Sequence, residues 1–93
     1  MSEPVDTDRT LRAILRDVLG LSDAQVAAMG PDSELFGALP ELDSMAVAGL
    51  LTEIEDRLHF HIDDDEVDGE MLETFGSLLA FVQAKRAAAA RAR

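Results

Sequence analysis

Apolar residues recur at the spacing of one helix face in three separate stretches of this chain, and this repeated pattern constrains the fold most. The clearest stretch reads "SMAVAGLLTEIEDRL". Its apolar residues fall at i, i+3, i+4, i+7 and i+11, namely Val47, Leu50, Leu51, Ile54 and Leu58. This spacing is typical of an amphipathic helix. It predicts a helix from about Ser44 to Leu58.

The same spacing occurs toward each end of the chain. The first set comprises Leu11, Ile14, Leu15 and Val18, and the last comprises Phe75, Leu78, Leu79 and Val82. The first set predicts a helix over residues 7–19, with Asp6 or Thr7 as its cap and Gly20 at its C′ position. The last set predicts a helix that Thr74 caps, and the alanine-rich residues after it favour its continuation.

The two connections between these helices have different patterns. Residues 20–43 contain apolar side chains too frequent for a free linker, so we expect this segment to pack across the helices, with Ser22 capping one short helical turn. In "DDDEVDGEMLETF" a short helix near residues 66–72 is expected, although Gly69 lies inside it. The predicted class is all-α: a small four-helix bundle of three main helices plus one short helix. Its predicted divisions are a flexible N-terminus (1–6), one domain (7–84) and a basic Ala/Arg-rich tail (85–93).

Charge and composition exclude several functions. The formal net charge is -11, and from Asp32 to Glu73 the only Lys or Arg is Arg57, against fourteen Asp and Glu. Binding nucleic acid requires clustered cations, so a nucleic-acid partner is not expected. The absence of Cys excludes disulfides and thiolate metal sites. No apolar run approaches the ~20 residues that span a bilayer, so we expect a soluble, cytoplasmic protein.

Ser44 and the acidic segment suggest two sites that the spacing then excludes. A serine hydrolase would need His59 or His61 beside Ser44, but one helix would separate Ser44 from His59 by roughly 22 Å. A calcium loop with Gly69 at its sixth position would place Phe75 where the bidentate Glu is required. We therefore predict neither catalytic residues nor a dedicated metal site, only weak divalent binding to crowded carboxylates.

Ser44 itself has two interpretations. Serine is among the preferred N-cap residues, so it could simply cap its helix. Asp43 could cap the helix equally well, which would leave the hydroxyl of Ser44 exposed beside backbone N–H groups that favour a phosphate. A phosphodiester on Ser44 fits this position better than catalysis does.

These residues resemble the acyl carrier proteins, including peptidyl and D-alanyl carriers. The similarity lies in "LDSM" followed by "AVAGLLTEIEDRLHFHI" and "DDDEVDGEMLETFGSLLAFV", within roughly residues 7–84. It implies that residues 7–84 are a carrier domain whose Ser44 bears a 4′-phosphopantetheine arm, installed from coenzyme A by a phosphopantetheinyl transferase. The thiol of that arm would hold an acyl or aminoacyl group as a thioester.

The resemblance also implies roles for residues around Ser44. Asp43 and Met45 would flank the attachment site and contact partners. The acids expected to face basic partner surfaces are Glu53, Glu55 and Asp56. The residues expected to line an interior for the acyl chain are Val47, Leu51 and Ile54. The implied partner that loads the arm is an adenylating acyl or aminoacyl ligase, or an acyltransferase, and the carrier is expected to be a monomer without activity of its own.

The chain departs from the pattern of fatty-acid-synthesis carriers. Those carriers commonly have Gly and a small residue before Asp-Ser, where this chain has Glu41 and Leu42. Ala46 and Gly49 stand at positions that are often acidic. The "LDSM" start is similar to D-alanyl carriers, and "ELFGALPELDSMAVAGLL" is similar to carriers of exosortase and exopolysaccharide systems. The pathway, in lipid or secondary metabolite biosynthesis, is left open, and the alternative function is an unmodified acidic helical protein-interaction module.

Overall fold

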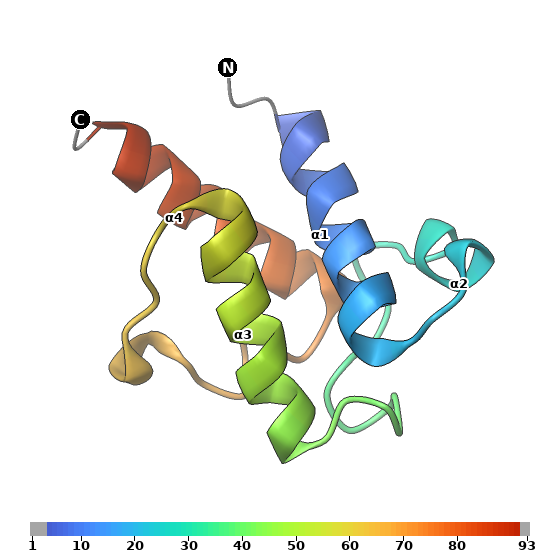
Figure 1. The fold of residues 1–93 in the computed structure, drawn as a ribbon. Helices are drawn as coiled ribbons and strands as arrows, with labels where there is room; N and C mark the ends of the chain where they lie inside the picture. The colour runs from blue at the N-terminus through green and yellow to red at the C-terminus, as the bar shows by residue number, and fades with distance from the viewer. Residues whose placement is uncertain (1–3, 92–93) are drawn as a thin grey trace.

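Four α-helices and one short 3₁₀ turn make up the chain in the computed structural model, which describes residues 4–91. In chain order they are α1 (Pro4–Leu19), α2 (Asp23–Ala27), α3 (Ser44–Leu58), the 3₁₀ turn η1 (Asp64–Glu66) and α4 (Phe75–Arg91). α1 packs against α2, α3 and α4, and α3 crosses in front of α4 in Figure 1. The predicted all-α bundle is therefore confirmed, with no strand in the part that the structure describes.

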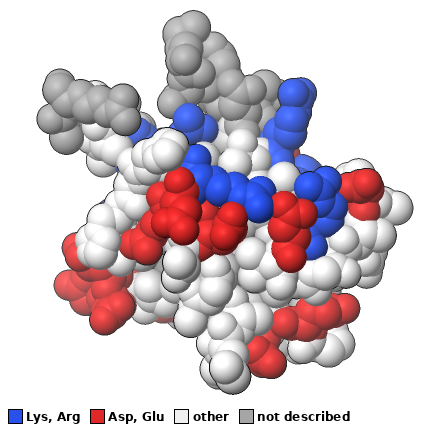
Figure 2. All heavy atoms as spheres, viewed as in Figure 1, with Lys and Arg blue, Asp and Glu red and all other residues white. Residues whose placement is uncertain are grey.

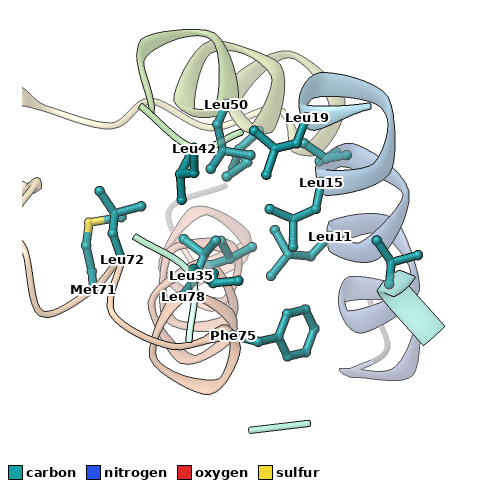
Figure 3. Close-up of a cluster of buried hydrophobic side chains, with 14 of the residues drawn as sticks. Leu11, Leu15, Leu19, Leu35, Leu42, Leu50, Met71, Leu72, Phe75 and Leu78 are labelled. Carbon is teal, nitrogen blue, oxygen red and sulfur yellow. The ribbon is translucent and has the colours of Figure 1, made fainter. Parts of the chain in front are cut away.

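The core lies where the three long helices face one another. Figure 3 shows Leu11 and Leu15 of α1 pointing toward Leu50 of α3 and Leu78 of α4. The side chains with no exposed area are Leu11, Ile14, Leu15, Leu35, Leu50, Ile54, Leu78 and Val82. Burial of a side chain of this kind contributes about 1.5–3 kcal/mol to the free energy of folding. These are mostly the residues whose spacing predicted the helices.

The ends of α1 agree with the prediction at one side only. Gly20 follows Leu19 with φ +72, and the amide of Leu21 donates to the carbonyl of Arg16 (3.1 Å), as in a Schellman C-cap. The predicted start at residue 7 is wrong, because the helix begins at Pro4, and proline is favoured in the first turn. Positions 6 and 7 consequently lie inside α1 and not at its start. Of the predicted flexible N-terminus, residues 1–3 lie outside the described residues, as do residues 92–93 of the tail.

The long connection between α1 and α3 is packed down, as predicted. Ser22 caps α2, and its side chain accepts from the amide of Gln25 (3.0 Å). Further along, the amide of Leu35 donates to the carbonyl of Glu73 (2.8 Å), and the amide of Phe36 donates to the carbonyl of Leu72 (3.0 Å). These bonds join the segment that leads into α3 to the segment that leads into α4.

The predicted short helix near 66–72 is wrong. A 3₁₀ turn occupies residues 64–66 instead, and turns follow at 69–73. Local polar side chains explain the difference. The carboxylate of Glu66 accepts from the amide of Asp63 (2.8 Å), and that of Asp68 accepts from the amide of Met71 (2.9 Å). Such bonds give the backbone partners outside a helix.

The start of α4 agrees with the prediction. The hydroxyl oxygen of Thr74 accepts from the amide of Ser77 (3.0 Å), as expected of an N-cap. The helix continues through the alanine-rich residues to Arg91. No helix within residues 4–91 combines the length and the apolar character that crossing a bilayer requires.

Candidate functional site

The first turn of α3 presents Ser44 to solvent. Asp43 is the N-cap, and its carboxylate accepts from the amide of Ala46 (2.8 Å). Of the two residues that the sequence left open as caps, Asp43 is therefore the one that caps α3. Ser44 is the first helical residue, it is exposed, and its hydroxyl makes no hydrogen bond to any residue that the structure describes. The amides of Ser44 and Met45 likewise have no acceptor within residues 4–91, as expected for the first turn of a helix.

This arrangement suits an attached phosphate. Free N–H groups at a helix N-terminus, together with the helix dipole, attract a negatively charged group. An exposed serine oxygen on the first residue places such a group close to those amides. The donors present therefore fit a phosphodiester on Ser44.

Two large apolar side chains are exposed in this region. Met45 is 86% exposed and follows Ser44 directly, and Phe36 is 46% exposed and lines a hollow together with Ser44. In Figure 2, charged side chains form a band across the middle of the face shown, and the surface below it, toward the start of α3, has uncharged side chains with acidic groups beside them at the lower edge. Met45 was predicted as a flanking residue. Phe36 was not, because the sequence showed only that its segment is apolar.

Two hollows meet at Ser44. The larger, which we call the α3 groove, has a volume of about 450 Å³. It is lined by Ser44, Val47, Ala48, Leu51, Thr52, Glu55, Ile62, Asp64 and Val67. The smaller, which we call the apolar hollow, has a volume of about 330 Å³ and is lined by Phe36, Ser44, Val47, Val67, Asp68, Gly69 and Leu72. Val47 and Val67 line both, so they stand between the two.

The residues predicted for an acyl-chain interior separate in the structure. Val47 and Leu51 are half-buried and line the α3 groove with Ser44. Ile54 has no exposed area and belongs to the core instead. Ile62 and Val67 complete the groove from the opposite side. The alternation of Phe60 and Ile62 with polar residues was the only sequence signal for that wall.

The three acids predicted to face partners also differ in their surroundings. The carboxylate of Glu53 pairs with Arg57 (2.6 Å), which also contacts Asp17 (2.8 Å). These two carboxylates raise the pKa of Arg57, with Asp17 as the larger cause. The carboxylate of Glu55 accepts from the amide of Ile62 (2.6 Å) and so lies against the chain itself. Only Asp56 is exposed without an ion pair to a residue of the described chain.

Neither histidine completes a metal site in the part of the chain that the structure describes. His61 lies between the carboxylates of Glu55 and Asp63, and within residues 7–91 no group of three potential ligands is placed to hold an ion. Phe75, at the last position of the calcium-loop pattern, is buried in the core.

Comparison with known proteins addresses the attachment chemistry. Residues 9–82 match the family model described as a phosphopantetheine attachment site. The solution NMR structure of a holo acyl carrier protein from Nitrosomonas europaea is similar to this chain, with 41% sequence identity and a TM-score of 0.78. The similarity covers 86% of this chain and 95% of that one. No similar sequence was found among curated proteins.

Proposed function

This chain belongs to the acyl carrier proteins, which bear a 4′-phosphopantetheine arm, and from that premise we propose that Ser44 is the residue to which the arm is attached. The arm supplies a thiol that carries an acyl group as a thioester.

The state of the other serines supports this choice. The side chain of Ser22 caps α2, that of Ser33 accepts from the amide of Gly30 (2.9 Å), and that of Ser77 bonds to Thr74 and Met71. Ser44 is the one serine within residues 7–91 whose hydroxyl makes no hydrogen bond in the described chain. This free, exposed hydroxyl at a helix N-terminus is the observation that carries the proposal.

The attachment step needs little from this chain. The oxygen of Ser44 forms a bond to the phosphorus of coenzyme A that carries the pantetheine, and the bond from that phosphorus to the nucleotide portion breaks. The hydroxyl proton passes to a base of the transferase. The carrier contributes the exposed oxygen, held in place by the Asp43 cap, and the first-turn amides stabilise the negative charge of the product.

We further propose that partners dock on the apolar surface beside Ser44. Met45 and Phe36 give that surface large side chains, and Asp56 adds one unpaired charge further along α3. Glu53 and Glu55 are bound within the chain, so they offer less charge to a partner than the sequence suggests. The expected partners are a phosphopantetheinyl transferase and an adenylating ligase or an acyltransferase, and the carrier itself is expected to act as a cytoplasmic monomer without turnover.

Intact-mass measurement tests the attachment residue. The purified protein is incubated with coenzyme A and a transferase of broad specificity, and one arm is expected to add to the wild type. Ser44→Ala should gain no mass, whereas Ser22→Ala and Ser33→Ala should gain the same mass as the wild type. Addition of the arm to Ser44→Ala would refute the assignment. A wild type that gains no mass with any transferase would favour the alternative, an unmodified interaction module.

A further inference from the structure

Both ring nitrogens of His61 face carboxylates. Nδ1 lies 3.2 Å from an oxygen of Glu55, and Nε2 lies 2.9 Å from an oxygen of Asp63. A neutral imidazole has one N–H donor, whereas the charged imidazolium has two. Both contacts are therefore ion pairs only when His61 is protonated.

The same carboxylate of Glu55 holds the wall of the α3 groove. Its Oε2 accepts from the amide of Ile62 (2.6 Å) and is also the oxygen nearest to Nδ1 of His61. Ile62 is only 7% exposed, and it lines the α3 groove together with Leu51 of α3. Glu55 therefore joins α3 to the segment that closes the groove, and His61 joins Glu55 to Asp63 in that segment.

The other charges around His61 are mostly negative. The charge of the imidazole makes a minor contribution to the lowered pKa of Glu66 of η1, and Lys85 of α4 is bound to Glu66 (2.9 Å). The protonated imidazole thus offsets carboxylates on α3, on its own segment and on η1. When His61 is neutral, Glu55 and Asp63 lose the cation between them.

We propose that Glu55, His61 and Asp63 form a proton-dependent clamp that positions the Ile62 wall of the α3 groove. The clamp is closed while His61 is charged and loosens when its imidazole is neutral. The clamp itself involves only residues of this chain. Its consequence rests on the proposed function: a group carried on Ser44 should gain access to the α3 groove more easily as the pH rises.

Amide exchange of Ile62 measures the clamp directly, because its N–H is the donor that Glu55 holds. Exchange is followed by NMR on the unmodified protein and expressed as a protection factor, so that the intrinsic pH dependence of exchange is removed. In the wild type, protection should fall by about threefold between pH 5 and pH 8, the size expected for an exposed ion pair.

The two histidines provide a matched pair of variants. His61→Gln should give an Ile62 protection factor that does not change with pH, since glutamine does not titrate. His59→Gln removes the neighbouring histidine, whose side chain makes no hydrogen bond or ion pair with the residues that the structure describes, and should keep the wild-type pH dependence. Glu55→Gln keeps an acceptor for the Ile62 amide but removes the charge, so its pH dependence should also vanish.

A wild-type protection factor that is constant with pH would overturn the clamp, and so would a His61→Gln protein that behaves like the wild type. His61 is 77% exposed in its side chain, so His61→Gln is expected to fold. The mass assay on Ser44 is independent of this measurement. Failure of one therefore leaves the other standing, and the two proposals can be separated.

Discussion

The carboxylate of Asp43 accepts from the amide of Ala46 at 2.8 Å, while the hydroxyl of the adjacent Ser44 bonds to no residue that the structure describes. Asp43 thus caps the helix, and the hydroxyl of the next residue, Ser44, stays exposed to solvent. Serine and aspartate are both strong caps, so the chain could have used either. Capping by Asp43 keeps the oxygen of Ser44 available without weakening the start of α3.

Substitution of Asp43 should therefore reduce the stability of the fold, whereas substitution of Ser44 should not. Asp43→Ala should lower the free energy of unfolding by about 1 kcal/mol, because the amide of Ala46 loses its acceptor. Asp43→Asn should retain most of the capping contribution, because its side-chain oxygen can still accept from the amide of Ala46. Ser44→Ala should leave stability nearly unchanged. Urea unfolding measures all three, and an equal loss for Ser44→Ala would show that the hydroxyl shares the capping role.

Two glycines should respond to alanine with opposite signs. A Cβ on Gly76 would lie 2.6 Å from the carbonyl oxygen of Pro31, which also accepts from the amide of Gly76. Gly76→Ala should therefore destabilise the fold by about 1–3 kcal/mol. A Cβ on Gly49 meets only Val18, at 4.0 Å, so Gly49→Ala should stabilise α3 by up to about 1 kcal/mol. Thermal unfolding of both variants checks this, and a gain for Gly76→Ala would contradict the packing described.

The carboxylate of Glu66 should add a pH dependence to stability at the acid side. The amide of Asp63 and, secondarily, Lys85 hold the pKa of Glu66 below its ordinary value. A carboxylate with a lowered pKa in the folded state stabilises the fold above its unfolded pKa, about 4.3, and loses that contribution as the pH falls through the folded value.

The wild type should therefore exceed Glu66→Gln in stability by a constant amount near neutral pH, and the difference should shrink below about pH 4. Glu70→Gln is the control, since Glu70 is exposed and its side chain makes no hydrogen bond or ion pair with a described residue. Denaturant unfolding across the acid range gives the comparison. A difference that stays constant down to the lowest pH would rule out the carboxylate of Glu66 as its source.

Docking should depend more on Met45 than on the acids of α3. Met45→Glu places a charge in the exposed apolar surface beside Ser44 and should lower kcat/KM of a loading enzyme by about tenfold or more, the effect of a central contact. Asp56→Lys should mainly slow association, with a weaker dependence on salt.

Ala87→Glu adds the same charge at an exposed position of α4, the helix whose C-terminal end lies away from the start of α3 in Figure 1, and should leave loading unchanged. Loading of the arm-bearing protein by candidate ligases, and by a malonyl transferase of fatty acid synthesis, measures these effects. Efficient malonyl loading that ignores Met45→Glu would contradict a docking surface centred on that residue.

The helices could be predicted because their apolar spacing reflects burial that the structure realises. Leu50 and Ile54 have no exposed area, and the bounds of α3 agree with the prediction. The same spacing could not show which apolar residues of α3 face the core and which face the α3 groove. Leu50 and Ile54 belong to the core, while Val47 and Leu51 line the groove, and this division depends on which segment packs beside each residue.

The acidic segment could not be predicted in the same way. The helix expected near 66–72 is replaced by turns because the carboxylates of Glu66 and Asp68 bond to backbone amides nearby. The role of Glu55 was hidden for a related reason. Its position on α3 suggested an acid open to partners, whereas its bond to the amide of Ile62 depends on how the chain returns after α3.

The pairing of Leu35 with Glu73 and of Phe36 with Leu72 has a consequence for the order of events during synthesis. The segment that leads into the Ser44 turn is fixed by residues that leave the ribosome much later. A growing chain that ends just beyond α3 already contains Ser44, but it lacks the strand-like partner that anchors the preceding loop. Recognition of the folded loop by a modifying enzyme should accordingly begin only once residue 73 and the start of α4 have emerged, so that chains that extend past this point are modified in preference to shorter ones.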